Sequence, residues 1–578
     1  MSKTSARPFG TSNSLFSQIP RAEIQRSAFD RSHGYKTTFN EGLLIPFFVD
    51  EVLPGDTFSL SWAAICRLTT PIVPFMDSVY LKAYWFFVPN RLVWKNWQRF
   101  MGEQENPTDS TDFLVPSFNT TGSGATYGTL CDYFGIRTGV KGISNINALP
   151  FRAYFKIWND WFRDENLQDS QGEWNQTTNP QHYTDPIGDA TIDYTLTQPL
   201  RRNKFHDYFT SSLPWPQKGV PVEISLGGSA PLSGSADLLL DPSVQTWTGT
   251  VWNTGGSSGT YTQPKPVNSP SYSGLWSKGR SSSGDLSLGF LSWSASSGGN
   301  NDGTVLKSIR MGNALDFSSL HVDLSQAQPI TINDLRQAFQ IQKLKERDAR
   351  GGTRYTEILR AHFGVVSPDG RLQRSEFLGS STSQIYVSEI AQTSSSDTTT
   401  PQGNLAAYAV GRDRKFGFTK SFVEHGFIIG LITATADLTY QQGVNRMWSR
   451  RDKYDFYWPA LAHLGEQATL NKEIFAQGTA DDDKVFGYQE RWAEYRYKPS
   501  MITGKLRSDD AQTLDFWHLS QRFENLPTLS SQFIEDRPPI DRVVAVQSEP
   551  HFILDAWFKL RCVRPMPVRS VPGLVDHF

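Results

Sequence analysis

The alternating segment near the end of the chain limits the folds open to it more than any other feature. Side chains on one face of residues 552–562 are apolar, and the opposite face is largely polar and charged. The apolar face holds Phe552, Leu554, Ala556, Phe558, Leu560 and Cys562, and the polar set is His551, Asp555, Lys559 and Arg561. Because side chains alternate between the two faces of a β-strand, this pattern predicts a strand with one face in a core. The chain therefore closes its core with a strand near its C-terminus.

Other segments show the same β character. Residues 56–66 alternate apolar side chains with serines, and residues 79–88 form a β-branched and aromatic run bounded by prolines. Residues 415–436 predict one long strand, in which Gly426 and Gly430 indicate bulges or close backbone approach. Aromatic residues make up 13% of the chain, and they favour pleated, half-buried surfaces and large interfaces. We therefore expect a mainly β protein.

Two segments show the helical period instead. Apolar side chains recur at helical spacing from Tyr154 to Trp161, shortly after Pro150, and predict an amphipathic helix with a wide aromatic face. A second helix is predicted from about residue 331 to residue 350, where a glycine pair follows. The basic side chains at its end complement the helix dipole, which explains them better than a nucleic-acid site does.

Residues 227–304 form the sharpest break in composition. Fourteen glycines and eighteen serines occupy these 78 positions, and only seven residues are charged. Aromatic side chains are spaced through the segment and can pack or bind, so it is not a simple flexible linker. The aromatic residues singled out are Trp247, Trp252, Tyr261, Tyr272, Trp276 and Trp293. We expect a surface insertion with short strands of its own.

Residues 1–40 predict a basic N-terminal arm. The arm holds six basic and two acidic side chains, whereas the whole chain carries a net charge of −2 and cannot coat nucleic acid through overall basicity. Such an arm can contact nucleic acid or lie along a neighbouring subunit, and both alternatives stay open. The candidate DNA-facing residues are Arg21, Arg26, Arg31 and Lys36, with Arg561, Arg564 and Arg569 near the C-terminus.

Residues 488–498 interleave arginines with aromatic side chains. The candidate residues are Tyr488, Arg491, Trp492, Tyr495, Arg496 and Tyr497. Such a mixture can stack bases and neutralise phosphates. It also forms subunit interfaces, and Glu490 and Glu494 can pair with the arginines, so an interface is the favoured interpretation.

Patterns for catalysis and cofactor binding are missing from the sequence. No histidines lie three or four residues apart, and neither a phosphate-binding glycine loop nor a dinucleotide-binding glycine motif opens a helix. Cys66, Cys131 and Cys562 are too far apart for a disulfide framework or a zinc site, which favours a reducing compartment. The sequence shows no signal peptide, and no apolar run reaches the ~20 residues needed to cross a bilayer. We expect a structural subunit without cofactor, metal or enzymatic activity.

Several longer stretches are distinctive beyond their composition. They are LPFRAYFKIWNDWFR at 149–163, EHGFIIG at 424–430, YDFYWP at 454–459 and residues 488–500, with further agreement at 29–33, 333–352 and 401–405. With these stretches in matching order, the chain resembles the major capsid proteins of microviruses, in the gokushovirus branch of small single-stranded DNA bacteriophages. The resemblance covers residues 20–226 and 305–578.

This resemblance implies an eight-stranded antiparallel viral jelly roll with long inter-strand loops that contain a few helices. Residues 41–578 would form that single domain, and 227–304 would form a protrusion at the three-fold axes that serves host attachment. The implied function is self-assembly, through five-fold and three-fold contacts, into a T=1 icosahedral capsid around circular single-stranded DNA. The implied partners are a small basic DNA-binding protein, an internal scaffolding protein, a minor pilot protein and a host cell-surface receptor. Assembly would take place in the host bacterial cytoplasm and leave the chain in the virion.

Two alternatives belong to other functional classes. A carbohydrate-binding or carbohydrate-active jelly-roll protein would use exposed tryptophan and tyrosine rings to stack on sugars. A single-stranded DNA-binding protein that acts as a monomer would show strongly salt-dependent binding. Neither alternative explains the distinctive stretches.

Overall fold

The computed structural model describes residues 25–171, 192–220, 222 and 332–569, apart from positions 353, 367, 372, 394–395 and 397–401, together with the backbone of the strands between residues 232 and 322. The chain divides into two compact units. One unit combines residues 1–221 with 342–578, and the other spans residues 222–341.

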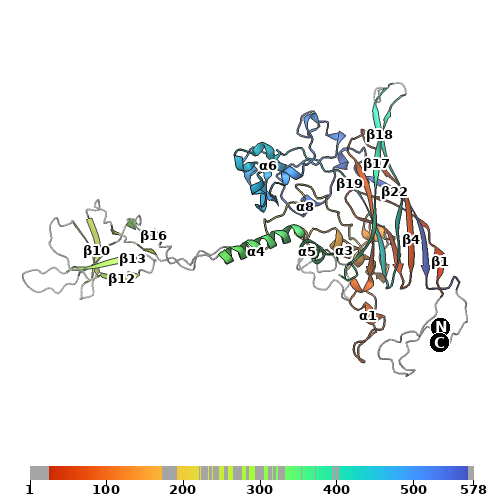
Figure 1. Ribbon diagram of the computed structural model, residues 1–578, viewed down its shortest axis with the longest axis horizontal. Coiled ribbons are helices and arrows are strands. Elements are labelled where there is room, and N and C mark those ends of the chain that lie inside the picture. The colour runs from red at the N-terminus through yellow and green to blue at the C-terminus, as the bar shows by residue number, and fades with distance from the viewer. Residues whose placement is uncertain are drawn as a thin grey trace, which may run out of the picture. The chain divides into compact units, whose positions relative to one another are not determined.

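The larger unit is built on one curled antiparallel sheet that forms two layers (Figure 1). The first layer contains β1 (Ser27–Asp30), β2 (His33–Phe39), β22 (Phe552–Arg564), β4 (Thr57–Leu68) and β18 (Leu405–Ser421). The second layer contains β17 (Glu376–Ala391), β5 (Val79–Pro89), β19 (Gly426–Ala436) and β3 (Ile45–Val52). The strand order is β1, β22, β4, β18, β17, β5, β19, β3, with β2 also on β22. β17 joins the layers, because it pairs with β5 over residues 376–385 and with β18 over residues 386–391.

An aromatic core lies between the two layers. Side chains of β4 and β22 alternate between the core and the outer face, which confirms the predicted period of two. The ring centroid of Trp85 in β5 lies 5.2 Å from Phe47 in β3, 6.2 Å from Trp62 in β4 and 6.1 Å from Phe558 in β22. Because these rings come from both layers, their packing holds the layers together.

Residues 415–436 form parts of two strands, so the prediction of one long strand is wrong. β18 ends at Ser421 and β19 begins at Gly426, and the residues between them cross from the first layer to the second. Phe422 is buried at this crossing, and its backbone N–H donates to the Asp56 carbonyl at 2.8 Å. The predicted close approach at Gly430 is confirmed, because a Cβ there would lie 2.6 Å from Cζ3 of Trp85. The pairing of β19 with β3 also shifts register directly after Gly430.

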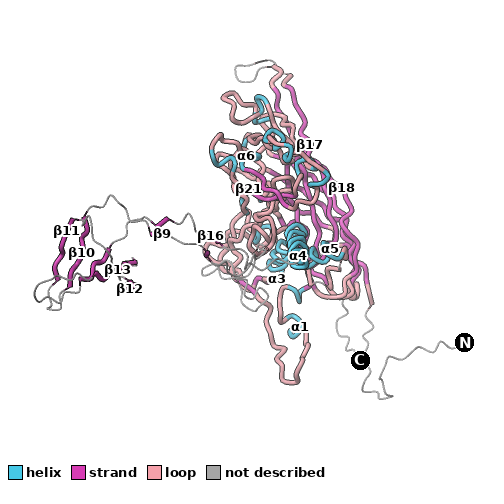
Figure 2. The backbone as a smooth tube through the Cα atoms, turned by 60° about the vertical axis from the view of Figure 1, so that its left-hand side comes forward, coloured by secondary structure: helices cyan, strands magenta, loops and turns pink. Residues whose placement is uncertain are grey.

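β19, in the second layer, is buried on both faces. Every residue of β19 is buried, and α3 (Leu149–Trp161) packs on the face that points away from the main core (Figure 2). The Tyr154 hydroxyl donates to the Leu44 carbonyl at 2.9 Å, and Nε1 of Trp161 donates to the Ser375 carbonyl at 3.0 Å. The predicted helix after Pro150 and its aromatic face are therefore confirmed.

Long loops between the strands carry the remaining short elements of the larger unit. They are α1 (Trp97–Phe100), β6 (Ser117–Phe118), α2 (Leu130–Tyr133), β7 (Ile146–Asn147), α5 (Tyr355–Phe363), β20 (Glu466–Leu470), α6 (Asn471–Ile474), β21 (Val485–Glu490), α7 (Ala493–Arg496) and α8 (Ser531–Ile534). The second predicted helix is α4 (Ile332–Gly351), whose residues belong partly to each unit.

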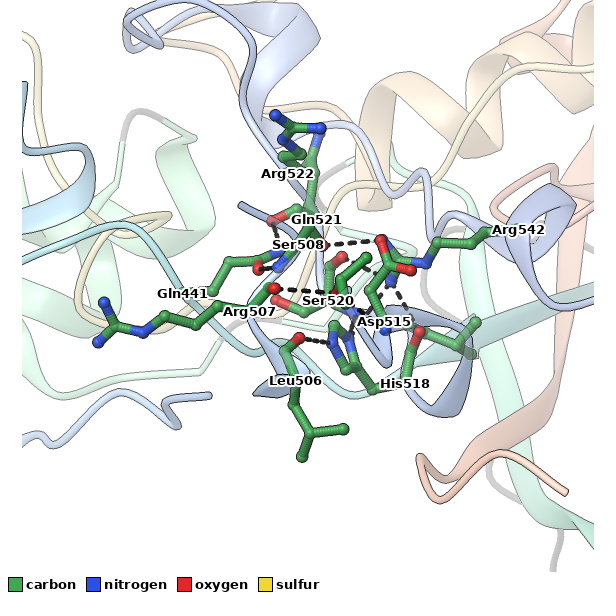
Figure 3. Close-up of polar contacts among 12 residues, drawn as sticks. Gln441, Leu506, Arg507, Ser508, Asp515, His518, Ser520, Gln521, Arg522 and Arg542 are labelled. Atoms are coloured by element: carbon green, nitrogen blue, oxygen red, sulfur yellow. Dashed lines mark hydrogen bonds and ion pairs between the residues drawn. The ribbon is translucent and has the colours of Figure 1, made fainter. Parts of the chain in front are cut away.

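A polar network fixes the loops that precede β22. Nη2 of Arg542 donates to the carbonyls of His518 at 2.7 Å and Ser520 at 3.0 Å (Figure 3). Gln441 follows β19 in the chain, and its side chain exchanges two hydrogen bonds with Ser508, at 3.1 Å and 2.7 Å. Buried polar groups are stable only with such partners. These contacts therefore give the loops a defined position although few strands or helices run through them.

The smaller unit contains short strands, as expected for the insertion. β10 (Thr246–Trp252) pairs with β11 (Ser258–Pro264), and β13 (Leu286–Ser292) pairs with β12 (Trp276–Arg280) and β14 (Val305–Ile309). Two further pairs join β9 (Asp237–Leu238) to β15 (Leu315–Asp316) and β8 (Leu232–Ser233) to β16 (His321–Val322).

Strands of the sheet begin at Ser27, which lies inside the range 1–40 that the sequence predicted as an arm. Both β1 and β2 pair with β22, so residues 27–39 belong largely to the first layer. Arg31 and Ser32 separate the two strands, which follow one another along β22. The sheet therefore has nine strands, where the resemblance implied eight.

Candidate functional site

The predicted DNA-facing residues of the N-terminal segment have different surroundings. Arg21 lies outside the described residues. Arg26 donates to the Gly55 carbonyl at 2.6 Å and to Oγ1 of Thr57 at 2.8 Å, and Arg31 pairs with Asp50 at 2.5 Å. Lys36 is exposed on β2 and pairs with Asp555 at 2.7 Å. These side chains tie the N-terminal strands to the rest of the sheet.

The C-terminal arginines also differ sharply from one another. Nε of Arg564 lies 3.1 Å from Oδ2 of Asp56, whose side chain is fully buried, and its Nη2 donates to the Glu51 carbonyl at 2.6 Å. Burial alone would lower the pKa of Arg564, but the neighbouring Cys562 and Asp56 outweigh burial and raise it. Arg564 thus neutralises a buried carboxylate, whereas Arg561 and Arg569 are exposed.

The two arginines of residues 488–498 have different surroundings. Arg496 pairs with Glu490, and Arg450 pairs with Glu494 at 3.1 Å. The Arg491 guanidinium lies 4.3 Å from the ring centroid of Trp492. Trp492 itself is 2% exposed, and its Nε1 donates to the Leu461 carbonyl at 3.0 Å, so this ring is structural.

Exposed aromatic rings gather beside this segment and form a surface that we call the aromatic patch. The patch consists of Tyr454, Phe456, Tyr457, Trp458 and Tyr495, each between 47% and 60% exposed. Tyr457 contacts the ring of Tyr495 at 6.3 Å between centroids, and Arg450 lies over both Phe456 and Tyr495. The Trp458 ring is oriented by the hydrogen bond of its Nε1 to the Lys453 carbonyl at 2.8 Å.

Sequence reasoning placed only Tyr495 of the aromatic patch among the candidate site residues. Its other members lie in or beside two 3₁₀ turns at residues 453–455 and 459–461, which leave no periodic signal. Tyr488 is half-buried in β21, and Tyr497 is exposed near the patch. The remaining candidates, Trp247, Trp252, Tyr261, Tyr272, Trp276 and Trp293, have side chains outside the described residues.

One cluster of buried ionisable groups resembles the environment of a catalytic site. Burial raises the pKa of Asp536 to about 7 and lowers the pKa of Lys204 to about 8. Shifts of this kind often mark functional sites, but ion pairs in a fold produce them as well. The Lys204 ammonium donates to the Phe533 carbonyl at 2.5 Å and to Oε1 of Gln521 at 2.9 Å, which ties three loops together. The shifted pKa values of this cluster therefore reflect its role in holding the fold together.

Within the described residues, no group of three or more metal-ligating side chains is present, and no helix is long and apolar enough to cross a membrane. What the described surface offers instead is the exposed aromatic patch, which lies in the loops and α7 that follow β19. The fold and these surfaces define the class of the protein, which is a structural subunit with a jelly-roll architecture.

Comparison with known proteins then gives the family. A family model described as "Capsid protein (F protein)" matches residues 17–574. The chain is 45% identical to Capsid protein VP1 of Chlamydia phage 1 and 45% identical to Capsid protein VP1 of Bdellovibrio phage phiMH2K, over 97% of this chain and 97% and 98% of the relatives. It is 38% identical to Capsid protein VP1 of Spiroplasma virus 4 over 99% of both chains. The chain belongs to this family of phage capsid proteins.

The family assignment confirms the resemblance drawn from the sequence. The protein is a capsid subunit and a component of the virion, and its role is structural rather than enzymatic. A carbohydrate-active enzyme and a monomeric DNA-binding protein are both set aside by this assignment.

Proposed function

We propose that copies of this chain form a T=1 icosahedral capsid that encloses circular single-stranded DNA, and that the aromatic patch is one of the contacts between copies. The patch carries the proposal, because its rings are half exposed in the single chain while Arg450, which lies over two of them, is already paired with Glu494. Large aromatic rings with few free charges are typical of the centres of protein interfaces.

The particle proposal is tested by electron microscopy of the expressed protein with and without an internal scaffolding protein. Uniform small particles of 60 copies would support a T=1 shell, which holds 60 subunits by icosahedral symmetry. Larger shells would contradict T=1, and persistent monomers in the presence of the scaffolding protein would contradict assembly of the chain itself.

The DNA within the shell requires further partners. The chain has a net charge of −2 and cannot neutralise a genome alone, so a small basic DNA-binding protein completes the proposal. An internal scaffolding protein and a minor pilot protein are the other proposed partners.

The smaller unit is the proposed site of host attachment. Contacts within the chain separate residues 222–341 from the rest, and this range contains the glycine- and serine-rich segment 227–304. A segment that the sheet does not need for its folding can change with the receptor. Its place at the three-fold axes is part of the same proposal.

Trp458→Ala is expected to reduce particle formation at least tenfold, because a central interface tryptophan typically contributes about 2 kcal/mol or more to association. The control is Tyr355→Ala in α5, an exposed ring that belongs to neither proposed surface, since Trp458 is 51% exposed and Tyr355 is 64% exposed. Particle yield is measured by sedimentation at equal protein concentration. Equal yields from both variants would contradict the assignment of the aromatic patch to a subunit contact.

A further inference from the structure

The outer face of the first layer is strongly basic. Five exposed cations lie on the three neighbouring strands β22, β4 and β18, and we call this surface the basic face. The cations are Arg67 on β4, Arg412 and Arg414 on β18, and Lys559 and Arg561 on β22. Arg412 and Arg414 are two residues apart in one strand, as are Lys559 and Arg561, so each pair is spaced by about 6.8 Å along the strand.

Strand register places these cations in adjacent rows. Arg412 lies opposite Ile65 and Arg414 opposite Ala63, while Lys559 and Arg561 lie opposite Ser61 and Ser59 on the other side of β4. The central strand thus contributes mostly small side chains between two basic strands. Arg67, Arg412, Arg414, Lys559 and Arg561 therefore follow one another at every second residue level of β4, and form a diagonal line over about 27 Å of that strand.

The five cations lack ion-pair partners among the described residues. Two carboxylates share this face. Asp555 pairs with Lys36 at 2.7 Å, and Asp30, which lies opposite Arg561 in register, accepts hydrogen bonds from the backbone and side chain of Ser32, so the cations still outnumber the carboxylates. Arg31 and Arg564, by contrast, each pair with a carboxylate. A concentration of unpaired charge of one sign destabilises a fold slightly and attracts a ligand of the opposite sign.

An open aromatic ring lies among these cations. Trp557 points outward from β22 opposite Gly34 of β2, and a Cβ on Gly34 would lie 3.4 Å from Cε3 of the Trp557 ring. The ring therefore rests against the backbone of β2, yet 55% of the residue remains exposed. Phe416 on β18 is 65% exposed on the far side of β4. Exposed rings between cations stack on unpaired bases, and duplex DNA cannot use them without unstacking.

Among the described residues, no helix packs on the basic face. Figures 1 and 2 show α3, α5 and α6 on one side of the strands, and β1, β4 and β22 lie at the opposite side in Figure 1. A second copy of the chain would have to meet the basic face with an acidic surface, because two basic faces repel each other.

We propose that the basic face is the surface that binds single-stranded DNA, with phosphates on Arg412, Arg414 and the β22 cations and a base stacked on Trp557. This inference rests on the proposed enclosure of single-stranded DNA and locates the contact. It differs from the expectation drawn from the sequence, since it assigns the contact to the face of a sheet and excludes Arg31 and Arg564.

The test measures binding of the full-length protein to a fluorescein-labelled oligothymidine by anisotropy over a range of salt concentrations. Arg412→Gln with Arg414→Gln is expected to reduce the slope of log affinity against log salt by about 1.4, since each cation contributes about 0.7 on single strands. The matched control is Arg137→Gln with Lys141→Gln, two exposed cations outside the sheet, which should leave the slope unchanged.

A second pair of variants tests the aromatic contact separately. Trp557→Ala should weaken binding about tenfold, Trp557→Phe should restore most of the affinity, and Tyr355→Ala, at an exposed ring in α5, should bind like the wild type. A duplex of the same length should bind more weakly than the single strand. Unchanged thermal unfolding of each variant shows that the fold is intact.

The outcomes separate the two proposals. If the wild-type chain binds no oligothymidine, the proposed enclosure of DNA by direct contact fails. If the wild type binds and the basic-face variants bind equally well with the same salt slope, the basic face is not the site, while enclosure of DNA stands. Variants that bind DNA normally and fail to form particles would show that the face is a subunit contact, which also overturns the inference.

Discussion

Trp85→Ala is expected to lower the free energy of unfolding by about 3–5 kcal/mol, the usual range for removing a large aromatic ring from a core. Trp85 is fully buried at the centre of the two-layer sheet, where Phe48 and Phe418 join the three rings described above, at 5.5 Å and 6.0 Å between centroids. Loss of the indole leaves a cavity lined by rings from both layers, and rings of this size cannot collapse into it. Urea unfolding followed by far-ultraviolet circular dichroism measures the change.

The control for this prediction is Trp85→Phe. Nε1 of Trp85 is buried and has no hydrogen-bond partner among the described residues, so phenylalanine removes no hydrogen bond and retains much of the ring contact. We therefore expect Trp85→Phe to cost much less than Trp85→Ala. Equal effects of the two substitutions would show that the space around the ring is not tightly packed.

Arg564→Ala is expected to destabilise the fold by about 3–5 kcal/mol, because it leaves the buried carboxylate of Asp56 without its cation. Arg561→Ala, only three residues away in the same strand, should change stability by no more than about 0.5 kcal/mol, since its side chain is exposed. Both variants are compared by urea unfolding at the same pH and salt concentration.

A double substitution checks the reason for this difference. Asp56→Asn with Arg564→Met removes both charges, and it should be more stable than Arg564→Ala alone, because no unpaired charge remains in the core. A double variant as unstable as Arg564→Ala would show that packing of the arginine against the ring of Phe58, rather than the charge, holds this corner together.

Sequence patterns predicted the strands and the helix that bury only one face. β4 and β22 alternate because one face meets the core and the other faces outward, and α3 shows the helical period because one side packs on the sheet. The break between β18 and β19 was missed because β19 is buried on both faces and so carries no alternation. β17 was not predicted because its middle, residues 379–384, holds no apolar side chain and interrupts any alternation.

The interaction surfaces could not be predicted from the sequence because they depend on distant partners. Asp56 and Arg564 are 508 positions apart in the chain, and only the pairing of β4 with β22 brings them together. Before that pairing was known, Arg561 and Arg564 looked equivalent. Trp557 likewise becomes a candidate for base stacking only when its place on the outer face, opposite Gly34, is known.

The position of β22 in the sheet sets a limit on the timing of folding during synthesis. β22 is near the C-terminal end of the chain, yet it lies between β4 and the two N-terminal strands, so β1 and β2 have no partner until it emerges from the ribosome. At about 5–20 residues per second, synthesis of the 578-residue chain takes roughly 30–115 s. Until β22 is made, β1 and β2 and one edge of β4 remain unpaired. The first layer of a nascent capsid subunit is therefore completed only after β22 is made, so only chains that include this strand can enter assembly with the whole sheet formed.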